Sequence, residues 1–167
     1  MIEVLISDAD YRLAQTAAMI RHNQDKEYKT SKPLSDDYQL VGCLGEIAFA
    51  CAFGFAWDSS NKPMGDGGVD FSEHTMTVDV KSARIPKWLF YGLNKKPPTV
   101  IVLAKVHTGN RRVQFVGWEY GDQVMEAPVG DMTGQGIQHH YILSSELRDM
   151  DQFRGKLRTY RDRVGAL

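Results

Sequence analysis

The sequence has few cysteines, and this excludes a disulfide-stapled scaffold. Only Cys43 and Cys51 are present among 167 residues. If both lie on one helix, their separation corresponds to a rise of roughly 12 Å, which is too far for a disulfide. We therefore expect two buried, reduced thiols, as suits a cytoplasmic protein.

Long apolar runs are also missing. The most apolar stretch, Ile47 to Trp57, is shorter than the roughly 20 residues that cross a bilayer. The segment Met1 to Asp8 lacks the basic start and the apolar centre of a signal peptide. We expect a protein of the cytoplasm that has no membrane partner.

Net charge is close to zero, at −1, but the two halves of the chain differ. Residues 1–80 contain 13 acidic and 6 basic residues, whereas residues 81–167 contain 8 acidic and 14 basic residues. The run from Lys81 to Trp118 contains no acid. Two interpretations are open: the basic half binds an anionic partner, or the charges of the two halves interleave on the folded surface.

The length and composition favour one globular domain over residues 1–167. Hydrophobic residues make up 43% and charged residues 25% of the chain, which is typical of a globular protein. A chain of this length buries a core without structural metals or disulfides. No internal repeat or linker divides it.

Hydrophobic periodicity predicts the order helix, helix, four strands, helix, so the class is α/β or α+β. The second helix is apolar on all sides and is therefore expected to be buried, with Gly54 ending it. The last helix is expected to be capped by Ser144. The predicted helices are Asp8 to Tyr28, Tyr38 to Phe53 and Ser144 to Tyr160, and the predicted strands are Val69 to Phe71, Met76 to Ser82, Thr99 to His107 and Arg112 to Trp118.

Glu46 is the only charged residue between Tyr38 and Trp57. A carboxylate in an apolar helix costs several kcal/mol unless it is paired, hydrogen-bonded or bound to a cation. Glu46 is therefore a candidate site residue. The alternatives are that it faces solvent at a helix edge or pairs with a lysine.

Three further charged residues, two carboxylates and a lysine, are candidates for the same site. Asp70 follows a glycine-rich run at 65–68, where glycine lets a backbone turn sharply or a ligand approach. Asp79 and Lys81 are two residues apart in a predicted strand and so share a face. Taken singly, Asp70 is a common turn aspartate and Asp79–Lys81 a common exposed ion pair.

Taken together, the four residues predict a phosphodiester-hydrolysing site. Asp70 and Asp79 on adjacent antiparallel strands would supply two carboxylates to a magnesium-like cation, and Glu46 would supply a third or hold a bound water. Lys81 would lie beside the water or the phosphate and offset negative charge.

The motifs Gly42-Cys-Leu-Gly-Glu46, Gly65-Asp-Gly-Gly-Val-Asp70-Phe and Thr77-Val-Asp79-Val-Lys81 resemble those of the PD-(D/E)xK nuclease superfamily. The resemblance covers about Tyr38 to Trp118. The run from Gly65 to Asp70 is similar to that of Mrr-like and Holliday-junction-resolvase-like members. Val69 stands where a proline often precedes the aspartate. The resemblance implies a restriction-endonuclease-like α/β core with a mixed central β-sheet of about four to five strands flanked by helices.

The resemblance also implies roles for individual residues. Glu46, Asp70, Asp79 and Lys81 would be catalytic, and the metal, Mg²⁺ or Mn²⁺, would be held by Asp70, Asp79, the carbonyl of Val80 and Glu46. Asp66 and Ser82 are further candidates at this site. The basic residues after the catalytic strand would bind DNA, and they are Arg84, Lys87, Lys95 and Lys96.

The resulting hypothesis is a cytoplasmic, metal-dependent deoxyribonuclease of a bacterial or phage-infected cell, similar to compact nucleases of phage and mobile elements. A homodimer or a larger nucleic-acid-processing complex stays open as a partner. The alternatives are a catalytically inactive nucleic-acid or protein binding module on the same fold and a small phosphatase. A zinc site at His139 and His140 is set aside, because adjacent residues of a strand point in different directions and no zinc-type Cys/His spacing is present.

Overall fold

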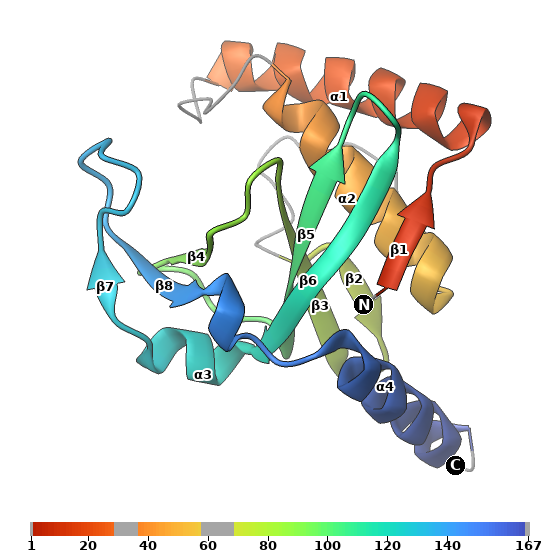
Figure 1. Ribbon diagram of the computed structural model, residues 1–167, viewed down its shortest axis with the longest axis vertical. Helices are drawn as coiled ribbons and strands as arrows, with labels where there is room; N and C mark the ends of the chain where they lie inside the picture. The colour runs from red at the N-terminus through yellow and green to blue at the C-terminus, as the bar shows by residue number, and fades with distance from the viewer. Residues whose placement is uncertain (1, 29–36, 58–68, 166–167) are drawn as a thin grey trace.

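The structure, a computed structural model, describes residues 2–28, 37–57 and 69–165 (Figure 1). It is an α/β protein, as the resemblance implies, with a mixed five-stranded sheet flanked by helices. The glycine-rich run 65–68 and Asp66 lie outside the described residues. The elements are β1 (Ile2–Leu5), α1 (Asp8–Tyr28), α2 (Tyr38–Phe53), β2 (Phe71–Glu73), β3 (Met76–Ala83), β4 (Trp88–Gly92), β5 (Val100–His107), β6 (Arg112–Tyr120), α3 (Gly121–Glu126), β7 (Val129–Gly130), β8 (His139–Leu143), a 3₁₀ turn (Ser144–Glu146) and α4 (Met150–Val164).

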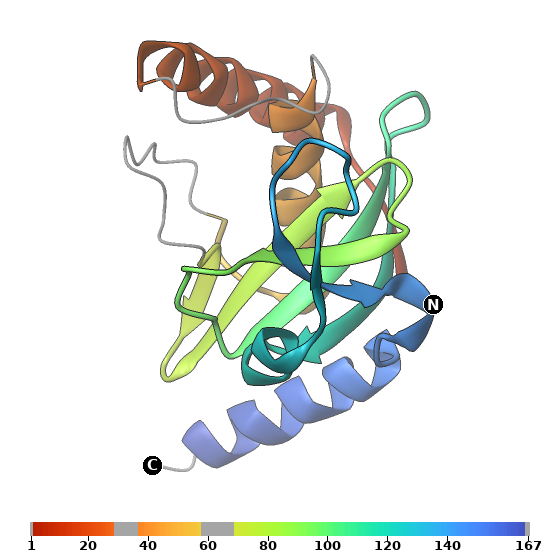
Figure 2. The same cartoon turned by 90° about the vertical axis from the view of Figure 1, so that its left-hand side faces the viewer.

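The five-stranded sheet has the order β1-β6-β5-β3-β2. Only β3 and β5 are parallel, and the other neighbours are antiparallel. The connection between these parallel strands contains β4, where a helix is usual. β4 pairs with β8 in a second sheet of order β4-β8-β7, which lies in front of the first in Figure 2.

β5 is central and buried on both faces. Val100, Val102 and Ala104 join a large core with α1, α2 and α4, whereas Ile101 and Leu103 join a smaller core with residues of β4 and α3. Burial on both faces explains the continuous apolar run, because neither set of alternating side chains meets water. The prediction of a central strand is confirmed.

α2 is the buried helix that its sequence predicts, and its predicted bounds are those observed. Gly54 adopts a left-handed conformation (φ 72°) and donates its N–H to the carbonyl of Ala50. Only glycine takes this conformation without strain, so it ends the helix. Phe49 packs against rings with centroids 4.7–5.9 Å away, namely those of Phe53, Phe55, Phe71, Phe115 and Phe153.

Several predicted boundaries differ from the observed ones, including the starts of β2 and of the last helix. β2 begins at Phe71 and not at Val69, although the N–H of Asp70 still donates to the carbonyl of Val78 at 2.9 Å. The last helix begins at Met150, because Asp149 accepts the N–H of Asp151 and caps it. Ser144 lies in the preceding 3₁₀ turn.

Sequence patterns did not predict four of the strands, and they gave the wrong burial for one cysteine. β1, β4, β7 and β8 have two to five residues each, too few for a clear alternation. Cys51 is exposed, not buried as predicted. No described helix is long and apolar enough to cross a membrane.

Candidate active site

β3 carries the tightest ion pair of the predicted site. The Nζ of Lys81 donates a 2.7 Å hydrogen bond to Oδ1 of Asp79. It also lies 2.5 Å from Oδ2, as an ion pair without a second hydrogen bond. The Asp79 side chain is 2% exposed and that of Lys81 is 33% exposed. The carboxylate is therefore buried, whereas part of the Lys81 side chain reaches the surface.

The prediction that Asp79 and Lys81 share a face is confirmed. Both lie on the side of β3 opposite Val78 and Val80, which belong to the large core. The Lys81 ammonium is 5.7 Å from the ring centroid of Tyr91, a buried residue of the smaller core. Asp79 is nevertheless buried, so the alternative of an exposed surface pair is wrong for the carboxylate.

Lys81 is an ammonium at neutral pH. Burial lowers the pKa of Lys81, but the charge of Asp79 and the hydrogen bond to it outweigh burial, and Asp70 and Tyr91 add to them, so the pKa lies above its usual value. Lys81 can therefore donate to an oxygen but cannot act as a base near neutrality.

Asp70 lies next to this pair on the neighbouring strand segment. Its Oδ2 accepts the N–H of Val80 at 2.6 Å. Extending the register Phe71↔Val78 by one residue places Asp70 opposite Asp79. The charge of Asp70 acts on both Lys81 and Arg21, so Asp70 lies within electrostatic reach of both ion pairs.

Glu46 is held by a cation from another helix. Arg21 of α1 donates to both of its oxygens, at 2.6 and 2.8 Å, and the indole N–H of Trp57 donates at 2.9 Å. Glu46 is 8% exposed. The hydrogen bond to Glu46 raises the pKa of Arg21, against the effect of burial. The pairing alternative for Glu46 is therefore observed, with arginine in place of lysine.

Sequence reasoning missed Arg21, although a pattern pointed to it. Ala14, Ala17 and Ala18 form the buried face of α1, and Arg21 follows at the next helical position on that face. An arginine that continues an apolar face requires a buried acid. Trp57 follows α2 and was not assigned to the site either.

The three predicted carboxylates do not converge into one metal site. Within the described residues, no group of three or more His, Cys, Asp or Glu side chains could hold a metal ion. α2 packs against the Val78–Val80 side of β3, whereas Asp79 faces the other side. The structure therefore places Asp70, Asp79 and Lys81 together and gives Glu46 a separate pair with Arg21.

Asp70 and Asp79 nevertheless fit a cation. Oδ2 of Asp79 is buried and accepts no hydrogen bond, and the positive charge beside it is the Lys81 ammonium at 2.5 Å. A metal ion bound there would take the place of that ammonium as the neutralising charge. Carboxylate and carbonyl oxygens are the ligands that Mg²⁺ prefers. The set that fits is Asp70 and Asp79, with the carbonyl of Val80 as a predicted third ligand.

Ser82 does not join this set. Its Oγ is buried without a hydrogen-bond partner, and a Cβ on Gly45 of α2 would lie 1.9 Å from it. Ser82 thus lies under α2, on the side of β3 that Lys81 does not face. Its role is in the close packing of helix on strand.

The four predicted DNA-binding residues are spread out. Arg84 forms an ion pair with Asp37 and donates to Oγ1 of Thr108 at 3.2 Å. Lys87 precedes β4 and lies over the ring of Trp88, whereas Lys95 and Lys96 follow β4. β4 has five residues and spans about 16 Å, so these lysines form no single cluster.

The charge asymmetry is largely resolved by pairing between the two halves of the chain. Four cations of the acid-free run pair with acids of the first half. The pairs are Lys81–Asp79, Arg84–Asp37, Arg111–Asp8 and Arg112–Glu3. The interleaving interpretation therefore accounts for half of the basic run. Within the described residues, Lys87, Lys95 and Lys96 have no carboxylate partner.

Comparison with known proteins adds no relative: no family model, curated protein or solved structure matches the chain.

Proposed function

We propose that the chain is a metal-dependent nuclease that hydrolyses DNA phosphodiester bonds at Asp70, Asp79 and Lys81. One observation carries the proposal: the buried Asp79 carboxylate, paired with Lys81, lies opposite Asp70 on an adjacent strand segment, and the Lys81 side chain is partly exposed. The resemblance of the motifs to the PD-(D/E)xK superfamily, with its restriction-endonuclease-like core, supports the same reading.

Each residue has a role in this proposal. Asp70 and Asp79, with the carbonyl of Val80, would hold Mg²⁺ or Mn²⁺. The bound cation supplies positive charge against the charge that develops on the phosphate. Lys81 would move its ammonium from Asp79 to a phosphate oxygen or to the attacking water, which its partial exposure permits.

In this proposal, Glu46 binds the cation only if its present hydrogen-bond donors release it. Both of its oxygens accept from Arg21 and Trp57, so it would reach a cation only by releasing Arg21. Because Glu46 lies in a cluster separate from Asp79, we expect Glu46→Gln and Asp79→Asn to have different effects. Asp79→Asn is expected to abolish cleavage, whereas Glu46→Gln is expected to lower stability more than cleavage.

The test is a cleavage assay on single-stranded, double-stranded and branched DNA, with Mg²⁺, Mn²⁺ or EDTA. Wild type should cleave at least one substrate in a metal-dependent way, and Asp79→Asn and Lys81→Met should reduce the rate by about a hundredfold or more. Asp162→Asn, an exposed carboxylate on α4, is the matched control and should cleave normally. Equal rates for wild type and Asp79→Asn on every substrate would refute the catalytic assignment.

The second candidate function is a catalytically inactive binding module of the same fold. The observation that favours it is the neutralisation of Glu46 by Arg21, which takes one predicted ligand away from the metal set. Calorimetry with millimolar Mn²⁺ separates the two functions, because the nuclease takes up the ion and the inactive module does not. A cytoplasmic location belongs to both proposals, and so does an open choice between homodimer and larger complex. A DNA partner belongs to the nuclease, whereas the inactive module would bind nucleic acid or a protein.

A further inference from the structure

A cavity of about 630 Å³ lies between α4 and the ends of β3, β5 and β6. Its volume is in the range of small-molecule sites. One wall comes from the strands, with Met76, Val100 and Tyr120, and the other from α4, with Phe153, Lys156 and Leu157. The cavity does not include Asp70, Asp79 or Lys81.

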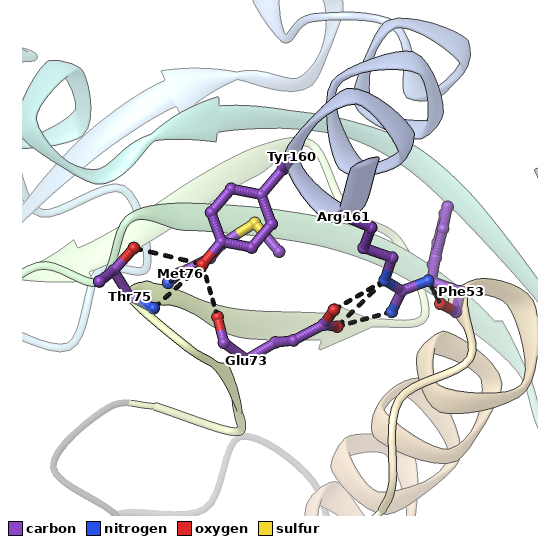
Figure 3. Close-up of polar contacts among 6 residues, drawn as sticks. All are labelled: Phe53, Glu73, Thr75, Met76, Tyr160 and Arg161. Atoms are coloured by element: carbon purple, nitrogen blue, oxygen red, sulfur yellow. Dashed lines mark hydrogen bonds and ion pairs between the residues drawn. The ribbon is translucent and has the colours of Figure 1, made fainter. Parts of the chain in front are cut away.

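α4 bridges this cavity because it is anchored at both ends. At the N-terminal end, Met150 and Phe153 are buried in the large core. At the C-terminal end, the hydroxyl of Tyr160 accepts the N–H groups of Thr75 and Met76 at 3.0 and 3.2 Å and donates to the carbonyl of Glu73 at 2.9 Å (Figure 3).

Arg161 completes the C-terminal anchor. It donates to both carboxylate oxygens of Glu73 and, at 2.8 Å, to the carbonyl of Phe53 at the end of α2 (Figure 3). The helix is thus fixed to the β2–β3 turn and to α2. The middle turn also packs on the sheet, because Leu157 is buried in the large core. The cavity therefore opens along the flank of α4 that carries Lys156 and Arg163.

A glycine inside α4, Gly155, is a second feature that bears on this cavity. It stands inside α4 and lines the cavity. A Cβ at this position would meet nothing within 4 Å. Glycine inside a helix is unfavourable relative to alanine, and no neighbour of this chain requires it here. Gly155 lies two residues from the buried Phe153 and so is not on the side of the helix that packs on the sheet. Without a side chain it leaves this part of the cavity rim open.

The lining chemistry suits an aromatic anion. Tyr120 and Tyr160, which are partly exposed, supply aromatic surface, whereas Lys156 and Arg163 supply positive charge. Trp118 and Phe153 also line the cavity but are 0% and 2% exposed, so they lie behind its surface. None of the lining residues is acidic. The Nζ of Lys156 is 5.5 Å from the ring centroid of Tyr120, so a cation and an accessible aromatic wall adjoin each other.

Two cations on one helix face favour more than one negative group. Lys156 and Arg163 are seven residues apart, two turns along the same side of α4. No ion pair with a described residue occupies either of them. Successive phosphates of a nucleotide, or of the end of a strand, can contact both cations, whereas a single small carboxylate contacts one.

We propose that this cavity binds a nucleoside phosphate, with the base against Tyr120 and the apolar wall and the phosphates at Lys156 and Arg163. The choice of a nucleoside over other aromatic anions rests on the proposed nuclease function. The ligand is either a free nucleotide or the phosphorylated end of a DNA strand, since both present the same base and phosphates.

The test is calorimetric titration of the full chain in EDTA, which prevents cleavage. The probes are dATP, a short oligonucleotide with a 5′-phosphate, the same oligonucleotide without it, adenosine and inorganic triphosphate. Binding of dATP assigns a free nucleotide, and binding of only the 5′-phosphorylated strand assigns a strand end. Adenosine and triphosphate should each bind at least about tenfold more weakly than the best probe.

Gly155→Leu fills the cavity and should weaken the best probe by about tenfold or more. Gly155→Ala should retain binding and raise the thermal midpoint by about 2–4 °C through helix propensity, which shows that the glycine is not needed for folding. Lys156→Met should weaken phosphate-bearing probes but not adenosine. Asp79→Asn, folded by circular dichroism, should bind as wild type does.

The outcomes separate this proposal from the nuclease. Binding that Gly155→Leu abolishes and Asp79→Asn preserves supports the cavity even if no DNA is cleaved. Cleavage by wild type without binding of any nucleotide or strand end refutes the cavity alone. Equal affinity of wild type and a folded Gly155→Leu also refutes it, as does tight binding of indole-3-acetate with no binding of the nucleotides.

Discussion

The ammonium of Lys81 donates a 2.7 Å hydrogen bond to the carboxylate of Asp79, two residues earlier on the same strand. The two partners differ in burial, since 2% of the Asp79 side chain and 33% of the Lys81 side chain are exposed. An unpaired charge therefore costs more at Asp79 than at Lys81. This difference in burial predicts which of the two residues the folded protein tolerates losing, and both residues belong to the proposed catalytic site.

Removing Lys81 should destabilise the protein more than removing the charge of Asp79. Lys81→Met leaves a buried carboxylate without its cation and should cost about 3–5 kcal/mol. Asp79→Asn leaves without its anion a lysine whose side chain is partly exposed, and it should cost about 1–3 kcal/mol. Urea unfolding at pH 7 measures both, and the double variant should recover part of the loss. The reverse order would contradict the burial asymmetry.

Metal should restore stability to Lys81→Met if Asp70 and Asp79 bind a cation. Millimolar Mn²⁺ would then raise its thermal midpoint, because a ligand that binds only the native state stabilises it. Asp79→Asn should show no such rise. A thermal midpoint of Lys81→Met that does not respond to Mn²⁺ would favour the inactive-module function.

Close approach of α2 to β3 depends on Gly45. A Cβ there would lie 1.9 Å from Oγ and 3.0 Å from Cβ of Ser82, so Gly45→Ala should destabilise the chain by about 1–3 kcal/mol through overpacking. Gly42→Ala, on the same helix with nothing within 4 Å, should stabilise it by about 1 kcal/mol. Adding Ser82→Gly to Gly45→Ala should recover stability. Chemical denaturation of the four proteins tests this, and equal effects of the two alanines would contradict it.

The anchor between Glu73 and Arg161 should weaken in acid. Hydrogen bonding from Arg161 lowers the pKa of Glu73 below 4.5, against a smaller effect of burial. Because the folded-state pKa is the lower one, the stabilisation is fully present above pH 4.5 and is lost as the pH falls through the folded-state pKa. Glu73→Gln should therefore be less stable than wild type at pH 7, and the two thermal midpoints should converge toward pH 3.

The control for this titration is Glu126→Gln, an exposed carboxylate at the end of α3 without an ion pair to any described residue. Its thermal midpoint should follow that of wild type at every pH. A constant difference between wild type and Glu73→Gln from pH 7 to pH 3 would show that the ion pair does not titrate with folding.

The two thiols should differ in reactivity. Burial raises the pKa of Cys43 to about 12, with added effects of Glu46 and Asp70 and an opposing effect of Arg21, and its side chain is fully buried. Cys51 is exposed. A disulfide reagent at pH 8 should label one thiol in the native protein and two in denaturant, since the thiolate is the nucleophile. Cys51→Ser should remove the fast phase, and two fast thiols in wild type would contradict the burial of Cys43.

Local patterns were sufficient for elements with a strong periodicity. α2 is apolar on every side and is buried as predicted, with Gly54 at its end. The alternation in β3 correctly placed Asp79 and Lys81 on one face. Short strands such as β4 and β8 carried no such pattern, because their pairing partners lie far away in the sequence.

The sequence by itself determined that Glu46, if it is buried in its apolar helix, must be neutralised, because a buried carboxylate has no solvent to stabilise it. The tertiary structure decided that it is buried. The sequence did not determine the partner either. Arg21, 25 residues away on another helix, is chosen by the packing of α1 on α2.

Tertiary structure alone likewise decided how the two oppositely charged halves pair, and it created the cavity under α4, whose walls come from three strands and a helix. Burial within an element follows from local periodicity, whereas the neighbours of a side chain follow from how distant elements pack.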